Sequence, residues 1–405
     1  MTLRIAAGWL LALATAAVAQ GPYRPVDDSV VLEQLPVPRL AGIASLQELR
    51  AHWVSRPTSV PAALAYARAA FELNRREEDP RYLGYAESAL APWWSSPQAP
   101  PEVVLLRASL RLARVDHALA EQDLRTLIDS QAPEGQAARI TRAGLRLLQG
   151  NPGGAEADCQ AAQHFVGKLV AQTCSAAVRG LRGEAAQALD ALDIALLGSA
   201  DAPLAAELWA RSVAAELAQR LGRTAPAKQH FEQAIRRMTA ADSPDPGLLA
   251  AYADFLLAQR DPRRVQALLT PFPRQDTLVL RLALAEGMLA RQGDATAQAA
   301  AQEHTRHLRL RFQEMRQRGD RSHMREQALF ELDVLGDAPA ALRSIAQAWS
   351  SQREPLDALL YLRAARAAGK PEAGADARAW VATTGLVDLR LAPELAAAQI
   401  AAPLR

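Results

Sequence analysis

The chain has 405 residues, of which 50% are hydrophobic but only 5% aromatic, and its formal net charge at pH 7 is +2. With so few aromatic residues, alanine and leucine must form most of the core, which favours closely packed helices over β-sandwiches. A nearly balanced charge gives no reason to expect nucleic acid as a partner, and we expect none.

Residues 1–19 have the features of a secretory signal peptide. Arg4 precedes an apolar run over residues 5–13, and Ala17, Val18 and Ala19 form a cleavage site before Gln20. The run is short for a membrane span, so we expect cleavage and no transmembrane anchor afterwards. An amphipathic first helix or a retained anchor is the alternative. Cleavage would make the protein soluble and exported, in the periplasm or outside the cell, where disulfides form.

Residues 20–44 are rich in proline and show no sustained helical period. We expect an extended N-terminal arm that packs on the first helices through Val30, Val31, Leu32 and Leu35. A disordered leader is the alternative.

From residue 45 onward the pattern is that of an all-α chain. Asn151-Pro152 and Asp261-Pro262 place a capping side chain before a proline, as is typical of helix starts. Gly-Asp pairs at 293–294, 319–320 and 336–337 are typical of a helix end followed by a new cap. No run of strand length alternates between polar and apolar residues.

An internal repeat with spacings of 33 and 39 residues runs through the middle of the chain, at the glycines Gly150, Gly183 and Gly222. Around each glycine, three alanines and one larger residue recur at fixed positions, and small residues are needed where two helices approach closely. These residues are Ala143, Ala155, Cys159 and Ala162, then Ala176, Ala188, Leu192 and Ala195, then Ala215, Ala227, Phe231 and Ala234.

This pattern resembles the tetratricopeptide repeat, whose motif has small residues and one bulky residue at the same relative places. The resemblance extends over residues 60–370, with a weaker unit that has Val115 where glycine is usual. It implies a right-handed α-solenoid of helical hairpins over residues 45–370, elongated because each hairpin contacts only its neighbours. A closing helix over residues 372–383 would begin a capping segment and tail at 371–405.

Proteins of this family are interaction modules, and the first helix of each hairpin lines a concave groove. The inward-facing positions of the family, carried over to this chain, imply a groove that binds a protein or peptide partner. Packing of the N-terminal arm in the same groove is the alternative. The early groove residues are Leu105, Ser109, Leu112, Ile140, Gly144 and Leu147, and the later ones are Trp209, Ser212, Glu216, Asp254 and Leu257.

The repeat register also places the two cysteines. Cys159 falls on the second helix of one unit and Cys174 on the first helix of the next, nearly equidistant from a turn at Val166-Gly167. Residues at equal distance from the turn of an antiparallel pair lie opposite each other, so we expect a disulfide. Two buried free thiols are the alternative, and two cysteines alone are too few for a metal site.

One region of the chain has a clear excess of basic residues. Seven arginines and three acids lie between His304 and Glu326, and we expect a basic face at Arg306, Arg309, Arg311 and Arg316. Its partner would be an acidic protein, a lipid surface or a polyanion, and a simply solvated face is the alternative. His304, His307 and His323 could bind a metal. We see no carboxylate placed to orient their rings, and we expect solvated histidines.

Motifs typical of enzymes are absent, among them G-x-S-x-G, H-E-x-x-H, the P-loop and C-x-x-C. We therefore expect no catalysis and no cofactor, and a scaffold or adaptor that binds another protein in the cell envelope. Two alternatives are the superhelical portion of an envelope glycan-processing enzyme, and a small-ligand or metal carrier that uses the basic helix.

Overall fold

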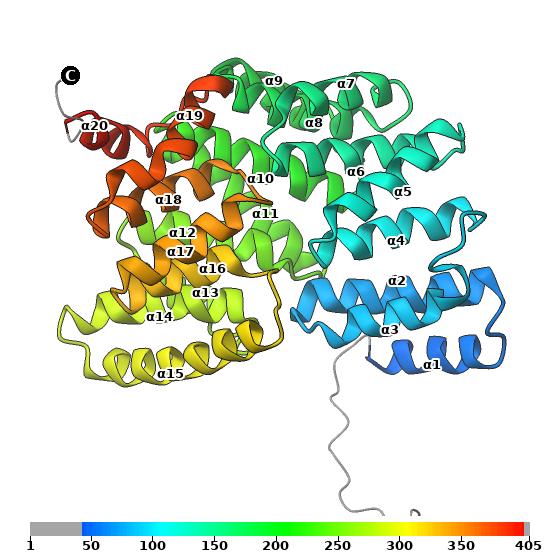
Figure 1. Ribbon diagram of the computed structural model, residues 1–405, viewed down its shortest axis with the longest axis horizontal. Coiled ribbons are helices and arrows are strands. Elements are labelled where there is room, and N and C mark those ends of the chain that lie inside the picture. Colours follow the sequence, from blue (N-terminus) through cyan, green and yellow to red (C-terminus); the bar gives the residue numbers. More distant parts are fainter. Residues whose placement is uncertain (1–42, 401–405) are drawn as a thin grey trace, which may run out of the picture.

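The computed structural model describes residues 43–400, and over that range it contains twenty α-helices and no strand. The all-α expectation is confirmed (Figure 1). The helices are α1 (Ile43–Val54), α2 (Val60–Glu77), α3 (Arg81–Leu90), α4 (Pro101–Ala113), α5 (His117–Asp129), α6 (Gly135–Leu148), α7 (Pro152–Ala162), α8 (Lys168–Leu181), α9 (Ala185–Leu197), α10 (Leu204–Arg220), α11 (Thr224–Ala240), α12 (Pro246–Ala258), α13 (Pro262–Leu269), α14 (Asp276–Ala290), α15 (Ala295–Gln317), α16 (Met324–Leu329), α17 (Ala338–Trp349), α18 (Pro355–Ala367), α19 (Ala375–Thr384) and α20 (Ala392–Ile400). A π-helical turn, η2 (Phe330–Val334), follows α16, and a 3-10 turn, η3 (Pro371–Gly374), precedes α19.

Successive helices pair as hairpins, and the three central repeat units correspond to α6–α7, α8–α9 and α10–α11. Their turn glycines Gly150, Gly183 and Gly222 have φ angles of 72°, 81° and 68°, which other residues rarely adopt. Val115 takes a φ of 63° at the equivalent turn, a strained conformation for a β-branched residue. The fold is a helical repeat of tetratricopeptide-like hairpins.

Side-chain caps begin several helices where the sequence predicts them. The Asn151 side chain accepts a hydrogen bond from the Gly154 N–H at 2.9 Å, and Asp261 accepts one from the Arg264 N–H at 3.3 Å. Asp294 and Asp337 cap α15 and α17 in the same way. These caps satisfy backbone N–H groups that have no partner inside the helix.

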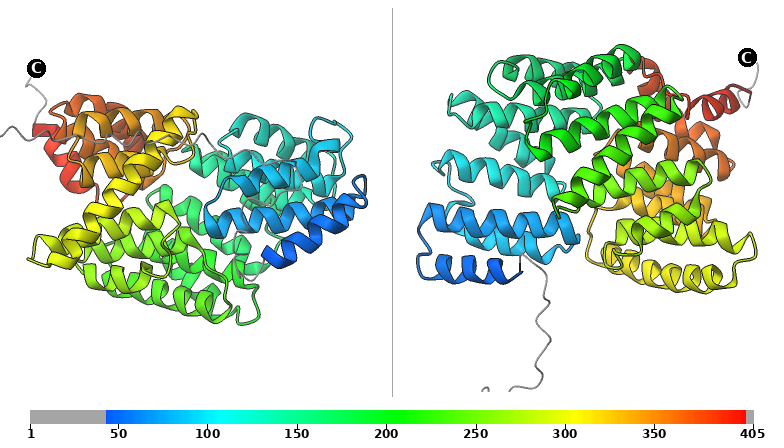
Figure 2. Two further views of the ribbon diagram at one scale, coloured as in Figure 1. Left: turned by 90° about the horizontal axis from the view of Figure 1, so that it is seen from below. Right: turned by 180° about the vertical axis from the view of Figure 1, so that it is seen from behind.

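The row of hairpins curves until its early and late parts meet (Figure 2). At the end of α2, Arg75 forms an ion pair with Asp245 at 3.4 Å. The Gln275 amide donates to the Arg76 carbonyl at 3.1 Å, and Glu78 accepts a hydrogen bond from the Thr277 N–H at 3.1 Å. The expectation of an elongated array is therefore wrong, because the small rotation between neighbouring hairpins accumulates until distant hairpins touch.

A second contact between distant parts of the chain involves residues 380–391, which we call the return segment. It passes over the turns of the three central hairpins, and each turn glycine lies close to it. A Cβ atom added to Gly150 would lie 2.4 Å from Trp380. The same distance would be 2.7 Å from Gly183 to Gly385 and 2.9 Å from Gly222 to Leu389, so these three positions have no room for a side chain. Trp380 Nε1 donates to the Gly150 carbonyl at 3.3 Å, and the Leu389 N–H donates to the Arg220 carbonyl at 2.9 Å.

The predicted helix over residues 372–383 corresponds to η3 and α19. Instead of only closing the end of the stack, this part of the chain joins an apolar cluster of α16–α19 to Leu181 of α8 and Leu147 of α6. The predicted signal peptide, the arm up to residue 42 and the tail beyond residue 400 lie outside the described residues.

Candidate functional site

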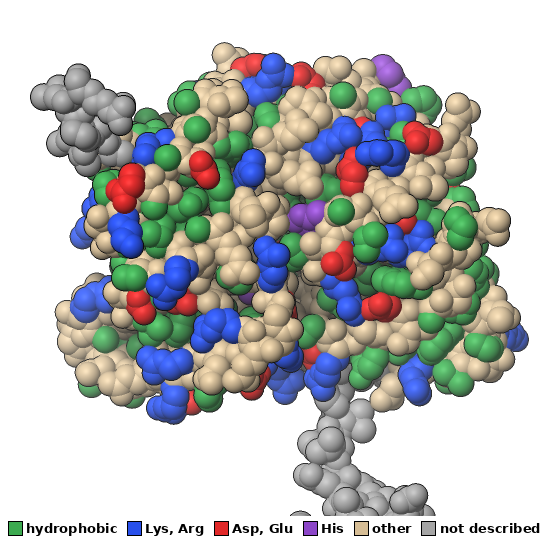
Figure 3. Space-filling model, in the orientation of Figure 1, with side chains coloured by type: hydrophobic (Ala, Val, Ile, Leu, Met, Phe, Trp, Pro, Cys, Tyr) green, Lys and Arg blue, Asp and Glu red, His purple; other side chains and the backbone are tan. Residues whose placement is uncertain are grey.

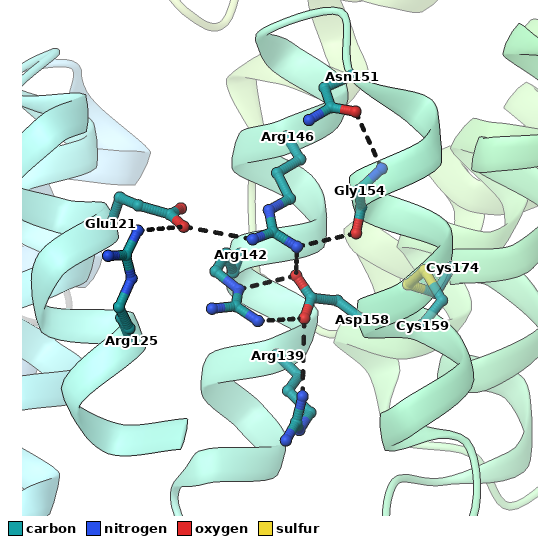
Figure 4. Close-up of polar contacts among 10 residues, drawn as sticks. All are labelled: Glu121, Arg125, Arg139, Arg142, Arg146, Asn151, Gly154, Asp158, Cys159 and Cys174. Carbon is teal, nitrogen blue, oxygen red and sulfur yellow. Dashed lines mark hydrogen bonds and ion pairs between the residues drawn. A yellow bond between two sulfur atoms is a disulfide. The ribbon is translucent and has the colours of Figure 1, made fainter. Parts of the chain in front are cut away.

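The predicted disulfide between Cys159 and Cys174 is present. Cys159 lies on α7 and Cys174 on α8, with their Cα atoms 5.7 Å apart (Figure 4). The two cysteines lie opposite each other across the turn between the hairpins, as the repeat register indicates. The bond links the first and second central units covalently.

Beside the disulfide, buried Asp158 is surrounded by arginines of α6 (Figure 4). Its carboxylate accepts hydrogen bonds from Arg142 at 2.9 and 2.6 Å and from Arg146 at 2.8 Å, and Arg139 lies 3.8 Å away. These bonds raise the pKa of Arg142 above its usual value. Arg146 also contacts Glu121 of α5 at 3.4 Å, so the cluster joins two hairpins.

The same arrangement occurs one hairpin earlier. Buried Asp123 accepts hydrogen bonds from Arg107 at 2.9 and 2.6 Å and from Arg111 at 2.7 Å. Our sequence analysis missed both clusters. A signal was available, because the two arginines and the aspartate recur with identical spacing after 35 residues, as Arg107, Arg111 and Asp123 and then as Arg142, Arg146 and Asp158.

The early predicted groove residues lie on one face of α4 and one face of α6. On each helix they are four and three residues apart, which places them on the same side. Leu105, Ser109, Leu112, Ile140 and Leu147 are half-buried, whereas Gly144 is exposed. The Ser109 hydroxyl donates to the Leu105 carbonyl at 3.1 Å.

The later groove residues are covered by the chain itself. Trp209, Ser212, Glu216 and Asp254, together with Gly144 and Leu147 of the early groove, line a cavity of 360 Å³. Its other walls include Glu354, Pro355 and Leu356 at the start of α18, and Arg390 of the return segment. The family's inward-facing positions imply either a groove that is accessible here or one that the N-terminal arm fills. Among the described residues, the start of α18 and Arg390 lie against these positions.

Two of these covered groove residues are already engaged in ion pairs. Burial raises the pKa of the Glu216 carboxyl, but the nearby guanidinium groups of Arg220 and Arg390 outweigh this effect and lower the pKa below its usual value. Asp254 accepts two hydrogen bonds from Arg281, at 3.0 and 2.8 Å. Both carboxylates are therefore already paired within the chain.

A larger space, which we call the inner cavity, lies between α12, α14 and α15 on one side and α16, η2 and α18 on the other. Its volume is 1020 Å³, and it shares Gln219, Asp254, Leu356 and Arg390 with the smaller cavity. Seven arginines but only two aspartates are among its lining residues.

On the face drawn in Figure 3, Lys and Arg side chains are scattered among acidic and hydrophobic ones. The four arginines of the predicted basic face lie in several environments. Arg306 and Arg309 line the inner cavity. Arg311 donates to Asp276 at 2.9 Å and to Glu314 at 3.1 Å. Arg316 lies 3.9 Å from Glu331 and lines a second cavity of 760 Å³, which Arg309 also lines. Arg309 is therefore shared by two cavities, and Arg311 lines neither of them.

The expectation that no carboxylate orients the histidines is wrong. His304 Nδ1 lies 2.8 Å from Glu286, and His307 Nε2 lies 3.1 Å from Asp276. Both carboxylates come from α14, which packs against α15. The hydrogen bond with Glu286 raises the pKa of His304, against the opposing effect of burial.

The three histidines do not come together as ligands of one metal. His323 Nδ1 lies 2.8 Å from the hydroxyl of its neighbour Ser322. Among the side chains that the structure describes, no three His, Cys, Asp or Glu residues converge as a metal site requires. Between residues 43 and 400, no helix combines the length and apolar composition needed to cross a membrane.

Comparison with known proteins adds little to this description. No protein-family model matches the chain, and no curated protein matches it. A solved tetratricopeptide repeat protein from Parabacteroides merdae is similar at a TM-score of 0.40 and 17% identity, over 65% of this chain and 92% of that one. The tetratricopeptide domain of P58(IPK) is similar at a TM-score of 0.21 and 13% identity, over 81% and 94% of the two chains. The fold assignment therefore rests on the hairpins described above.

Proposed function

We propose that the chain is a non-catalytic scaffold that binds a peptide segment of another protein on the inner face of α4 and α6. One observation supports this surface above the others. Leu105, Leu112 and Ile140 are half-buried apolar residues outside the cavity of 360 Å³, whereas most of the later groove residues line that cavity opposite α18 and the return segment. Half-buried apolar side chains at helical spacing suit the apolar side of an extended or helical peptide.

Photo-crosslinking in cells tests this surface. A probe at Leu112 or Ile140 is expected to give one dominant product with another protein, identified by mass spectrometry. The matched control is a probe at Ile194, an apolar residue of α9 that is 71% exposed. Identical products from all three probes, or crosslinks only to residues 20–44 of the same chain, would refute a specific partner site on α4 and α6.

We also propose that the chain is exported to the cell envelope and that Gln20 is the first residue of the mature protein. The sequence of residues 1–19 and the Cys159–Cys174 bond support this location, because disulfides persist in oxidising compartments. Mass spectrometry of the N-terminal peptide from fractionated cells is expected to identify Gln20 in the exported fraction. Recovery of the chain only from the cytoplasm, with both thiols free to react with an alkylating agent, would contradict export.

A further inference from the structure

The inner cavity has a size that suits a small molecule. Ligand pockets in proteins enclose about 300 to 1,000 Å³. The inner cavity reaches 1020 Å³. It is formed by helices that are far apart in sequence, since α12 and α14 face α16 and α18 across it. Its shape therefore depends on the closure of the helical array.

One wall of the cavity is polar and basic. The helix α15 contributes Gln298, Ala301, Gln302, Thr305, Arg306 and Arg309. This stretch is about 16 Å long at a rise of 1.5 Å per residue. Arg306 and Arg309 are three residues apart and share one helix face. Arg306 pairs with exposed Glu303, and Arg309 has no ion pair among the described residues.

The other walls are largely apolar. Five half-buried side chains line them: Leu257, Leu284, Met288, Leu329 and Leu359. Apolar surface of this kind is stabilised when a ligand removes it from water, by about 25 cal/mol per Å². The hydrophobic effect thus favours an apolar ligand group against these walls.

The remaining arginines of the cavity are mostly neutralised by carboxylates. Arg281 pairs with Asp254 at 2.8 Å, and Arg363 pairs with Asp333 at 2.7 Å. Arg325 donates to Asp357 at 2.5 Å. Arg390 pairs with Asp388 in the same way. Of the seven arginines, only Arg291 and Arg309 have no ion pair among the described residues, and Arg309 lies on the α15 wall, so an added negative charge is stabilised there.

We propose that the inner cavity binds a single-chain anionic amphiphile, with its carboxylate or phosphate head on Arg306 and Arg309 and its chain against the apolar walls. A cavity with one basic wall and several apolar walls matches a ligand that has an anionic head group and an apolar chain. An ammonium head group would be repelled by the two guanidinium groups, which gives selectivity by charge. This proposal is independent of the partner surface on α4 and α6.

Titration calorimetry with soluble amphiphiles of one chain length tests the charge selectivity. We expect one molecule of dodecanoate or dodecyl phosphate to bind per chain below its micelle concentration. Dodecyl maltoside is expected to bind more weakly, and dodecyltrimethylammonium weakest of all. The relative affinities of the two anions distinguish a carboxylate from a phosphate ligand.

Substitution of the basic wall tests the position of the head group. Arg309→Gln is expected to weaken binding of the anions by about tenfold, the effect of one lost charge-assisted hydrogen bond. Arg318→Gln is the matched control, because Arg318 lies at the end of α15 and is absent from the cavity wall. Equal losses in the two variants would show only a general effect of charge and would overturn the assignment.

Filling the cavity tests the position of the chain. Gly287 of α14 lines the cavity, and a Cβ atom added there would meet only Arg291 Nη1, at 3.6 Å, so the position has room for a side chain to begin. Gly287→Leu is expected to abolish binding. Gly84→Leu on α3 is the matched control, since a Cβ atom there has no neighbour within 4 Å. Circular dichroism would verify that both variants fold.

Three results would overturn the proposal. They are equal binding of cationic and anionic amphiphiles, unchanged binding in Gly287→Leu, and absence of amphiphile binding to the unaltered protein. In the last case, a protein crosslink from a probe at Met288 that disappears in Gly287→Leu would assign the cavity to a peptide instead.

Discussion

At the scale of single residues, buried carboxylates surrounded by arginines distinguish this chain from a simple alanine-leucine repeat. Asp158 and Asp123 are 1% and 3% exposed, and each is held by at least two arginines. An ionised carboxylate at such a position is tolerated only when its hydrogen bonds are satisfied. The arginine clusters therefore link the two helices of the hairpins α4–α5 and α6–α7.

Removal of one such carboxylate should be costly. Asp158→Ala leaves Arg142 buried without a partner, and we expect it to lower the free energy of unfolding by about 3–5 kcal/mol. Denaturant unfolding measures the change. The control is Asp190→Ala, which removes an exposed ion pair with Arg223 and should change stability by at most about 0.5 kcal/mol. Similar losses in the two variants would contradict a structural role for the buried cluster.

The pairing of His304 with Glu286 predicts a dependence on pH. Because the pKa of His304 is higher in the folded chain than in the unfolded chain, its stabilising effect is complete below the unfolded pKa, about 6.5, and is lost as the pH rises through the folded pKa. His304→Gln should therefore destabilise the protein more in mildly acidic than in mildly alkaline buffer. Unfolding curves at both pH values measure this difference.

The exposed residue His164 provides the control, since His164→Gln should give the same small effect in both buffers. A destabilisation by His304→Gln that does not change with pH would show that the hydrogen bond with Glu286 does not depend on protonation. The carboxylate could not be assigned from sequence, because Glu286 and Asp276 lie 18 and 31 residues before the histidines they contact.

At the scale of elements, the central hairpins could be predicted because their determinants are local. A turn glycine, small residues at fixed offsets and one larger residue indicate the helix pairs α6–α7, α8–α9 and α10–α11 without reference to the rest of the chain. The position of Cys174 opposite Cys159 follows from the same register. The weaker unit before them has the same turn, because Val115 takes the left-handed conformation that glycine takes in the three central turns.

The disulfide should stabilise the contact between α7 and α8. The cysteines are 15 residues apart, and closing a loop of that size stabilises a protein by about 3 kcal/mol in the chain-entropy description. The double variant Cys159→Ala/Cys174→Ala should lose about this amount. Thermal unfolding with and without reductant provides the test. Reductant should destabilise the original chain and leave the double variant unchanged, and equal sensitivity of both would contradict the prediction.

At the scale of the whole molecule, the array is closed by contacts that sequence analysis did not predict. The hydrogen bonds of Arg76 and Glu78 with α14 and its cap join residues 199 positions apart. Which residues meet across such a sequence separation depends on the rotations of all the hairpins between them. A local sequence pattern does not determine the total rotation. For the same reason, the C-terminal cover over Trp209 and Glu216 could not be predicted.

One side chain of the return segment tests this closure. Trp380 packs against Trp349 with ring centroids 5.5 Å apart and donates to the Gly150 carbonyl. Trp380→Ala should destabilise the protein by about 3–5 kcal/mol. Hydrogen exchange should become faster in the α6–α7 turn as well as in α17–α19, because the contact supports both. The control is Phe165→Ala, at a position that is 70% exposed. Faster exchange confined to the C-terminal helices would contradict coupling across the closure.

The passage of residues 380–391 over Gly150, Gly183 and Gly222 has a consequence for how the protein can change in length. An open solenoid tolerates the gain or loss of a hairpin, because a new unit needs only to fit its two neighbours. Here an extra hairpin between α9 and α10 would move the third glycine away from Leu389 and would separate Glu78 from Thr277. The number of hairpins is therefore fixed, as the number of strands is in a closed barrel.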